Sequence, residues 1–236
     1  MYDELNIFGF NHKLMLTKSE KSFSILYIIL LTLEIATSSI ESLANLNYIA
    51  KPLLLISLIF FFWKKSSHLD HKLRRMIFFA LGFSLLGDIL LMFVNQSANF
   101  FIGGLIAFLI AHIFYVLVFL KQRNRSKNPF LFIGFVLLYG MLLFYFLKDG
   151  LGDMLLPVIL YMVIILSMAS TAFLRQGYVV KNSFVLVFIG AILFMISDSI
   201  LALNKFYQPL AFTNFSIIFT YAFAQLFIVF GLLKQR

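Results

Sequence analysis

The stretch GFSLLGDILLM, residues 82–92, decides the fold class of this chain. It is an apolar helical segment with a single carboxylate, Asp88, about midway between the charged start of its helix and the exit. An Asp at the centre of a membrane helix costs roughly 2.5–3.5 kcal/mol, so a chain that keeps one there uses it or pairs it. The remaining sequence indicates that the chain lies in a membrane, and it contains the side chains that could pair with Asp88.

The composition is that of an integral membrane protein. Of the 236 residues, 62% are hydrophobic and 12% are charged, and the mean hydropathy is +0.98. A water-soluble core needs no such excess of apolar residues. The apolar runs have the length of membrane helices and lack the alternation of barrel strands. We therefore predict an all-α polytopic membrane protein.

Hydrophobic runs between charges predict eight transmembrane helices in a single membrane domain, residues 1–236. Of the 19 Lys and Arg residues, 16 fall in alternate extramembrane segments that include both termini. The positive-inside rule then predicts that both termini are cytoplasmic. The basic residues form no stripe with exposed aromatics, so we expect no nucleic-acid partner. The predicted spans are Ser22–Ile40, Tyr48–Trp63, Met76–Val94, Phe100–Leu120, Pro129–Leu147, Met154–Leu174, Ser183–Leu203 and Phe212–Leu233.

Three pairs of short motifs recur in one order, at offsets of 105, 110 and 113 residues. They predict two parallel four-helix repeats, about residues 22–120 and 129–233, with a site between the halves. The first pair would open its helices, where proline is tolerated in the first turn. The pairs are Lys51-Pro52 with Leu156-Pro157, Gly87-Asp88 with Ser197-Asp198, and Ala111-His112 with Ala224-Gln225.

Polar residues of different predicted helices fall at one depth. With 1.5 Å per residue, Asp88 lies ~18 Å and Asp198 ~22 Å from the cytoplasmic starts of their helices, and Glu34 and Lys51 share that level. His112 and Gln225 lie one or two turns nearer the cytoplasm. This layer predicts a buried polar cavity.

Two aspartates facing one cavity of low dielectric constant cannot both ionise freely, so one would hold a proton while the other stays charged. Such a division makes an acid/base pair. The alternative is that each aspartate only bonds helices together. Glu34 could pair with Lys51 or belong to the site, and Lys51 could instead hold a phosphate or extend to the interface.

Aromatic and polar side chains follow the same helices. On the fourth predicted helix, Gly104, Phe108, His112 and Tyr115 share one stripe, and helix packing is the alternative role for the aromatics. The matching residues on the sixth and eighth helices are Tyr161, Met168, Tyr221 and Gln225.

Several enzyme classes are excluded by absent motifs. The chain has no Cys, no Gly-x-Ser-x-Gly, no P-loop and no His-Glu-x-x-His. Only His112 is intramembrane, while His68 and His71 lie in a basic connector, so a three-His zinc site cannot be assembled. We expect no metal and no cofactor. Residues 1–21 contain no cleavable signal, so the first membrane helix is expected to direct insertion.

Six motifs in order, from about Lys51 to Leu233, resemble the YhhN-like lysoplasmalogenase family. The first 47 residues carry no matching motif, so Glu34 lies outside the resemblance. The motifs are Lys51-Pro52, Gly87-Asp88, Ala111-His112-x-x-Tyr115, Leu156-Pro157 with Tyr161 and Met168, Ser197-Asp198-x-x-Leu201-Ala202, and Tyr221-x-x-Ala224-Gln225.

The resemblance implies a membrane ether hydrolase that cleaves the vinyl ether bond of lysoplasmalogens, giving a fatty aldehyde and a glycerophospho-alcohol. It implies that Asp88 and Asp198 are catalytic, and vinyl ether hydrolysis indeed needs one protonated and one ionised carboxyl group. We expect a lysophospholipid substrate, contact with membrane lipids and a location in the bacterial cytoplasmic (inner) membrane; the oligomeric state stays open. Expected substrate-binding residues are Lys51, His112, Tyr115, Tyr161, Tyr221 and Gln225.

Two other functions are compatible with the sequence. A proton- or cation-coupled transporter or lipid scramblase would also have a parallel repeat and midplane carboxylates. A non-catalytic lipid-binding or scaffold protein would bind lipid without turnover.

Overall fold

Each predicted membrane segment is a single α-helix in the structure, a computed structural model that describes residues 16–235. Every predicted boundary lies within five residues of a helix end. Short 3₁₀ turns occur at Glu41–Leu43, Lys148–Gly150 and Gly152–Met154. The helices are α1 Lys18–Ser39, α2 Ala44–Lys65, α3 His71–Leu91, α4 Ala98–Lys121, α5 Phe130–Leu147, α6 Leu155–Phe173, α7 Lys181–Phe206 and α8 Thr213–Leu233.

Seven of these eight helices are long and apolar enough to cross a membrane. The other, α3, has 21 residues, but it carries Lys72, Arg74 and Arg75 in its first turns and Asp88 near its end. Apolar helices of this length satisfy their backbone groups internally, as a bilayer requires. The protein is therefore an all-helical integral membrane protein that crosses the membrane several times.

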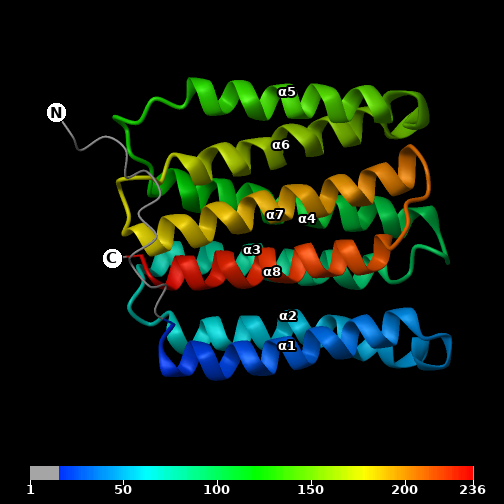
Figure 1. The fold of residues 1–236 in the computed structure, drawn as a ribbon, viewed down its shortest axis with the longest axis horizontal. Coiled ribbons are helices and arrows are strands. Elements are labelled where there is room, and N and C mark those ends of the chain that lie inside the picture. Colours follow the sequence, from blue (N-terminus) through cyan, green and yellow to red (C-terminus); the bar gives the residue numbers. More distant parts are fainter. Residues whose placement is uncertain (1–15, 236) are drawn as a thin grey trace.

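Helices that follow one another in sequence run in opposite directions, so the connectors gather at two ends of the bundle (Figure 1). One end, here called the basic end, holds the C-terminus and the connectors 66–70, 122–129 and 174–180. The opposite end holds the connectors between α1 and α2, α3 and α4, α5 and α6, and α7 and α8.

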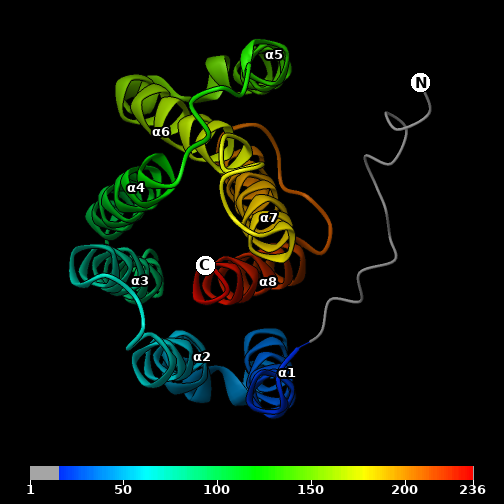
Figure 2. The ribbon, with the colours of Figure 1, turned by 90° about the vertical axis from the view of Figure 1, so that its left-hand side faces the viewer.

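Viewed along the bundle, helices α1, α2, α3, α4, α6 and α5 form an arc, and α7 and α8 lie on its concave side (Figure 2). The most extensive helix contacts join α7 to α8 and α3 to α4. Glycines permit these close approaches, as small residues do in membrane bundles. A Cβ atom on Gly190 of α7 would lie 2.8 Å from the carbonyl oxygen of Ala224 in α8.

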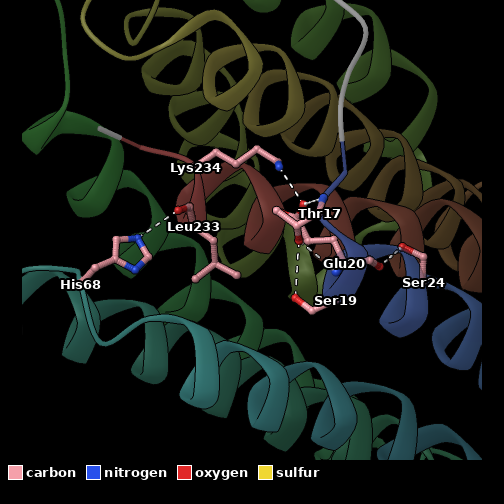
Figure 3. Close-up of polar contacts among 7 residues, drawn as sticks. All are labelled: Thr17, Ser19, Glu20, Ser24, His68, Leu233 and Lys234. Atoms are coloured by element: carbon pink, nitrogen blue, oxygen red, sulfur yellow. Dashed lines mark hydrogen bonds and ion pairs between the residues drawn. The ribbon is translucent and has the colours of Figure 1, made fainter.

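Polar contacts fix the helix ends that lie at the basic end of the bundle. Asp70 caps the start of α3, and the backbone N–H groups of Leu73 and Lys72 hold the pKa of Asp70 below its ordinary value. Lys234, just after α8, forms an ion pair of 2.8 Å with Glu20 of α1 (Figure 3). These contacts hold the start of α1 against the end of α8.

The connector between α6 and α7 is anchored by Arg175, whose side chain is fully buried. Its guanidinium donates to Oε1 of Gln122 at 2.9 and 3.2 Å, to Oγ of Ser183 at 3.0 Å and to Oε1 of Gln235 at 3.4 Å. All these acceptors are neutral, and burial lowers the pKa of Arg175 to about 9. The side chain therefore stays charged at neutral pH and joins α4, α7 and the end of α8.

Two predictions about helix ends are wrong. Helix α2 begins at Ala44, so Pro52 is its ninth residue and lies inside the helix rather than in the first turn. The 3₁₀ turn before Ala44 starts the helix about one turn earlier than the hydrophobic run from Tyr48 suggests. Helix α3 starts at the Asp70 cap and ends at Leu91, because the chain turns toward α4 there. Asp88 thus lies in the last turn of α3, not midway.

Candidate active site

The two aspartates predicted as catalytic lie equally far along their helices. Asp88 follows the first residue of α3 by 17 residues, and Asp198 follows the first residue of α7 by 17 residues. With a rise of 1.5 Å per residue, each lies ~26 Å from the helix start. The two carboxylates interact electrostatically. The site therefore forms where the α3–α4 pair faces the α7–α8 pair.

Asp88 is buried at the end of a chain of hydrogen bonds. The phenol of Tyr221 donates to its Oδ2 atom at 2.7 Å, and Nε2 of Gln225 donates to the Tyr221 oxygen at 3.4 Å. The phenol of Tyr115 donates to Oε1 of Gln225 at 2.8 Å. The chain runs from α4 through α8 to α3, so three of the predicted substrate-binding residues gather around Asp88.

Asp198 accepts a hydrogen bond from another phenol. The hydroxyl of Tyr161 in α6 donates to Oδ2 of Asp198 at 2.5 Å. The side chain of Asp198 is 15% exposed, compared with 4% for residue Asp88 as a whole. Each catalytic candidate thus has its own tyrosine, but Tyr221 reaches Asp88 from the other half of the sequence.

His112 lies between the Asp198 carboxylate and aromatic rings. Its Nε2 atom is 3.8 Å from Oδ2 of Asp198, which is too long for a hydrogen bond. The ring stacks edge-on against Phe194 at 4.5 Å and Tyr161 at 5.4 Å, measured between centroids. Within residues 16–235, neither ring nitrogen has a hydrogen-bond partner. The imidazole is therefore able to bond to a bound ligand.

A narrow apolar pocket begins at Asp198 and Tyr161, with about 50 Å³ open to water-sized molecules. Its walls come from five helices, α3 to α7, and Asp198 is the acidic residue among them. Such an apolar wall next to a carboxylate is chemically suited to the end of a hydrocarbon chain that carries a polar group. The apolar walls include Leu91, Phe101, Phe108, Val158, Ile165 and Ala202.

Glu34 and Lys51 lie on the other side of Asp88, in α1 and α2. Both interact electrostatically with Asp88 and with each other. Glu34 is 1% exposed, and Lys51 is half-buried. No ion pair within 4.0 Å joins Lys51 to a carboxylate in the described part of the chain. Direct pairing of Glu34 with Lys51, one of the predicted alternatives, is therefore not found.

Tyr27 of α1 also reaches this region, and no sequence motif indicates it. Its phenol donates to the carbonyl oxygen of Ala222 in α8 at 3.1 Å, next to Tyr221. Tyr27 and Glu34 are seven residues apart, which places both on one helix face. That spacing is the signal by which the sequence could have revealed Tyr27.

The site gathers groups that transfer protons: two carboxylates, four phenols and an imidazole. No group of three or more His, Cys, Asp or Glu side chains that could hold a metal ion occurs in residues 16–235. Phenol donors and low dielectric surroundings let neighbouring carboxyl groups differ in protonation. The arrangement is suited to general acid/base chemistry on an amphipathic molecule.

The chain is similar to known proteins. The YhhN family model matches residues 46–232. Human lysoplasmalogenase TMEM86A is 29% identical over 170 residues, covering 71% of this chain and 69% of the relative. Human lysoplasmalogenase TMEM86B is 33% identical over 135 residues, covering 57% of this chain and 55% of the relative. Lysoplasmalogenase TMEM86A of Bos taurus is 28% identical over 171 residues, covering 71% of this chain and 69% of the relative. No solved structure matches the chain significantly. Since the family model spans most of its length, this chain belongs to the YhhN family.

Proposed function

We propose that this protein is a membrane-bound lysoplasmalogenase, which hydrolyses the vinyl ether bond of a lysoplasmalogen to a fatty aldehyde and a glycerophospho-alcohol. The names of the human relatives support this activity. The observation that carries the proposal is the pair of carboxylates, Asp88 and Asp198, which interact with each other while Asp198 lines an apolar pocket.

The reaction uses the two carboxyl groups in different protonation states. The protonated group delivers its proton to the vinyl carbon farther from the ether oxygen, and an oxocarbenium ion forms. The ionised group stabilises this cation and accepts a proton from the water that attacks the carbon bonded to oxygen. The resulting hemiacetal breaks into the aldehyde and the glycerol alcohol. One water is consumed, and no redox partner is needed.

The residues around the carboxylates orient them and the substrate. Tyr161 and Tyr221 each hold one carboxylate oxygen, Gln225 donates to Tyr221, and Tyr115 donates to Gln225. His112, beside Asp198, donates to or accepts from the ether or hydroxyl groups of the substrate.

The proposal is tested by mass spectrometry of lysoplasmalogen incubated with purified protein. The wild type should release fatty aldehyde, whereas Asp88→Asn and Asp198→Asn should each lower the rate by about 10²–10⁴-fold. Asp149→Asn, which changes an exposed acid in the α5–α6 connector, serves as the matched control. Folded Asp88→Asn and Asp198→Asn variants with wild-type rates would contradict the mechanism. Lipid flux in proteoliposomes without aldehyde would favour a transporter instead.

We further propose that α3 also crosses the membrane, giving eight spans with both termini in the cytoplasm. Helix α3 lies alongside the other helices (Figure 1), and the alternating directions of the bundle need it as a span. Lys64, Lys65, Lys121 and Arg123 lie at the basic end, which would face the cytoplasm.

The chain is proposed to be a single domain, residues 1–236, of two parallel repeats near residues 22–120 and 129–233. The equal positions of Asp88 and Asp198 in α3 and α7 support the repeat. Pro52 and Pro157 occupy different turns of α2 and α6, so this motif pair does not support it. A bacterial cytoplasmic membrane stays a prediction, because the curated relatives are from human and cattle.

A further inference from the structure

The two neighbouring ionisable residues Glu34 and Lys51 take no part in the proposed reaction. Glu34 is 1% exposed, and its Oε2 atom has no hydrogen-bond partner within residues 16–235. A buried carboxylate oxygen without a partner is costly, so it calls for a ligand or another explanation. We propose that Glu34 and Lys51 form the headgroup subsite for a zwitterionic lysophospholipid, in which Glu34 binds the ammonium group and Lys51 the phosphate. This inference rests on the proposed function.

The electrostatic contacts order the groups across the bundle. Asp198 lines the apolar pocket and interacts with Asp88, and Asp88 interacts with Lys51 and Glu34. The two aspartates thus lie between an apolar wall and the two residues Glu34 and Lys51. A lysoplasmalogen has the same order, with an alkyl chain, a vinyl ether, and then a phosphate and an ammonium group. A lipid with its chain in the pocket and its vinyl ether at the carboxylates would therefore direct its headgroup to Glu34 and Lys51.

The depth of this subsite also fits a lipid headgroup. Glu34 precedes the last residue of α1 by five residues, and Lys51 follows the first residue of α2 by seven. These positions are ~8 and ~11 Å inside the same end of the bundle. A headgroup at that level remains near the polar interface, which begins at the edge of the hydrocarbon core.

Other contacts, which include an interaction of the Asn47 side chain with the Glu34 carboxyl group, hold this region in place and leave Oε2 of Glu34 without a partner. Asn47 of α2 donates to Oγ1 of Thr37 at 3.2 Å and to the carbonyl oxygen of Glu34 at 3.5 Å. Tyr27 fastens the same face of α1 to Ala222 in α8. The backbone at Glu34 is therefore positioned, while its Oε2 atom is left for a cation.

The test compares three substrates with the same alkenyl chain: alkenyl glycerophosphoethanolamine, alkenyl glycerophosphate and alkenyl glycerol. Glu34→Gln should lower kcat/KM for the ethanolamine lipid by on the order of tenfold, mainly through KM, because a charge-assisted hydrogen bond is lost. The loss on the other two substrates should be smaller by that factor, because any effect of the lost charge on Asp88 is common to all three. Lys51→Met should lower kcat/KM for both phosphate-bearing substrates more than for alkenyl glycerol, since its effect through Asp88 is common to all three.

Glu41→Gln, an exposed change in the turn between α1 and α2, is the matched control and should alter none of the three. An equal loss on all three substrates with Glu34→Gln would overturn the subsite, as would no loss on the ethanolamine lipid. If Glu34→Gln does not fold, the same kcat/KM values are measured for Glu34→Asp. This variant keeps the negative charge, so it should keep a preference for the ethanolamine lipid over alkenyl glycerophosphate.

Failure of the proposed function is recognised separately, because the wild type would then release aldehyde from none of the substrates. In that case binding of uncleavable 1-alkyl lysophosphatidylethanolamine is compared with binding of 1-alkyl lysophosphatidate by native mass spectrometry. The subsite predicts tighter binding of the ethanolamine lipid and loss of that difference in Glu34→Gln. Equal binding of both lipids by the wild type would contradict it.

Discussion

At the scale of single residues, the two carboxylates are matched in position but not in surroundings. Asp88 is almost fully buried and bonded to Tyr221, whereas Asp198 is bonded to Tyr161 and faces the pocket. Both phenol bonds go to Oδ2, so Oδ1 of each carboxylate takes no part in them. Because Asp198 faces the pocket and Asp88 does not, Asp198 is favoured as the group that first meets the vinyl ether.

Removal of either phenol should impair the site without dismantling the bundle. Tyr161→Phe and Tyr221→Phe each delete one hydrogen bond to a carboxylate, which should lower the free energy of unfolding by about 1–3 kcal/mol and the rate of aldehyde release by about tenfold. Enzyme assays and thermal unfolding measure the two effects. Tyr145→Phe, at a residue that is 63% exposed, should change neither. Wild-type activity in both site variants would show that the phenols do not orient the carboxylates.

At the scale of helices, the site depends on two closely packed pairs. Gly87 precedes Asp88 in α3, and a Cβ atom on it would lie 2.6 Å from the ring of Phe108 in α4. Gly231 of α8 approaches α7 just as closely, since its Cβ atom would lie 2.9 Å from the carbonyl oxygen of Ser183. Helices α3 and α4 thus pack closely beside Asp88, and α7 and α8 pack closely near the basic end, so larger residues at these glycines would separate them.

Gly190→Ala should therefore destabilise the protein by about 1–3 kcal/mol, because its Cβ atom would meet backbone rather than a movable side chain. Thermal unfolding in detergent is the measurement. Gly134→Ala, on an exposed face of α5 where no atom lies within 4 Å of the new Cβ, should be neutral or slightly stabilising. Equal stability of Gly190→Ala and the wild type would mean that α7 and α8 pack less closely than a contact of 2.8 Å to the Ala224 carbonyl oxygen requires.

At the scale of the whole molecule, the distribution of charge predicts how the bundle lies in the membrane. The connectors of the basic end contain Arg123, Arg125 and Lys127, whereas the connector between α3 and α4 contains neither Lys nor Arg. The orientation of a membrane protein follows such a bias, with the loops richer in Lys and Arg in the cytoplasm. The proposed headgroup subsite lies toward the less basic end, so it would be reached from the side opposite the cytoplasm.

Single cysteines can test this orientation, because the chain has no native Cys. Ser126→Cys lies in an exposed connector of the basic end, and Gln208→Cys lies in an exposed connector of the opposite end. In intact cells, a membrane-impermeant maleimide should label Gln208→Cys, and it should label Ser126→Cys only after the membrane is broken. The reverse pattern would place both termini outside, and equal labelling from one side would contradict the proposed topology.

Much of the fold follows from hydrophobicity alone. A bilayer requires about 20 consecutive apolar residues per helix, so the helical segments are recognisable without tertiary information. The helix ends at Ala44 and Leu91 deviate because caps and 3₁₀ turns, not hydrophobicity, determine where they fall. The site is recognisable in part, since a carboxylate such as Asp88 in an apolar helix is costly enough to indicate a function.

The sequence by itself determined the membrane class, the helical segments and the level shared by Asp88 and Asp198, since these depend on local hydrophobicity and on the fixed rise of a helix. The tertiary structure decided which phenol bonds which carboxylate, and it brought Glu34 of α1 to Asp88 although α1 lies outside the family match. The physical reason is that these pairings depend on how the helices pack around one another, and packing through contacts far apart in sequence is not encoded in any local spacing.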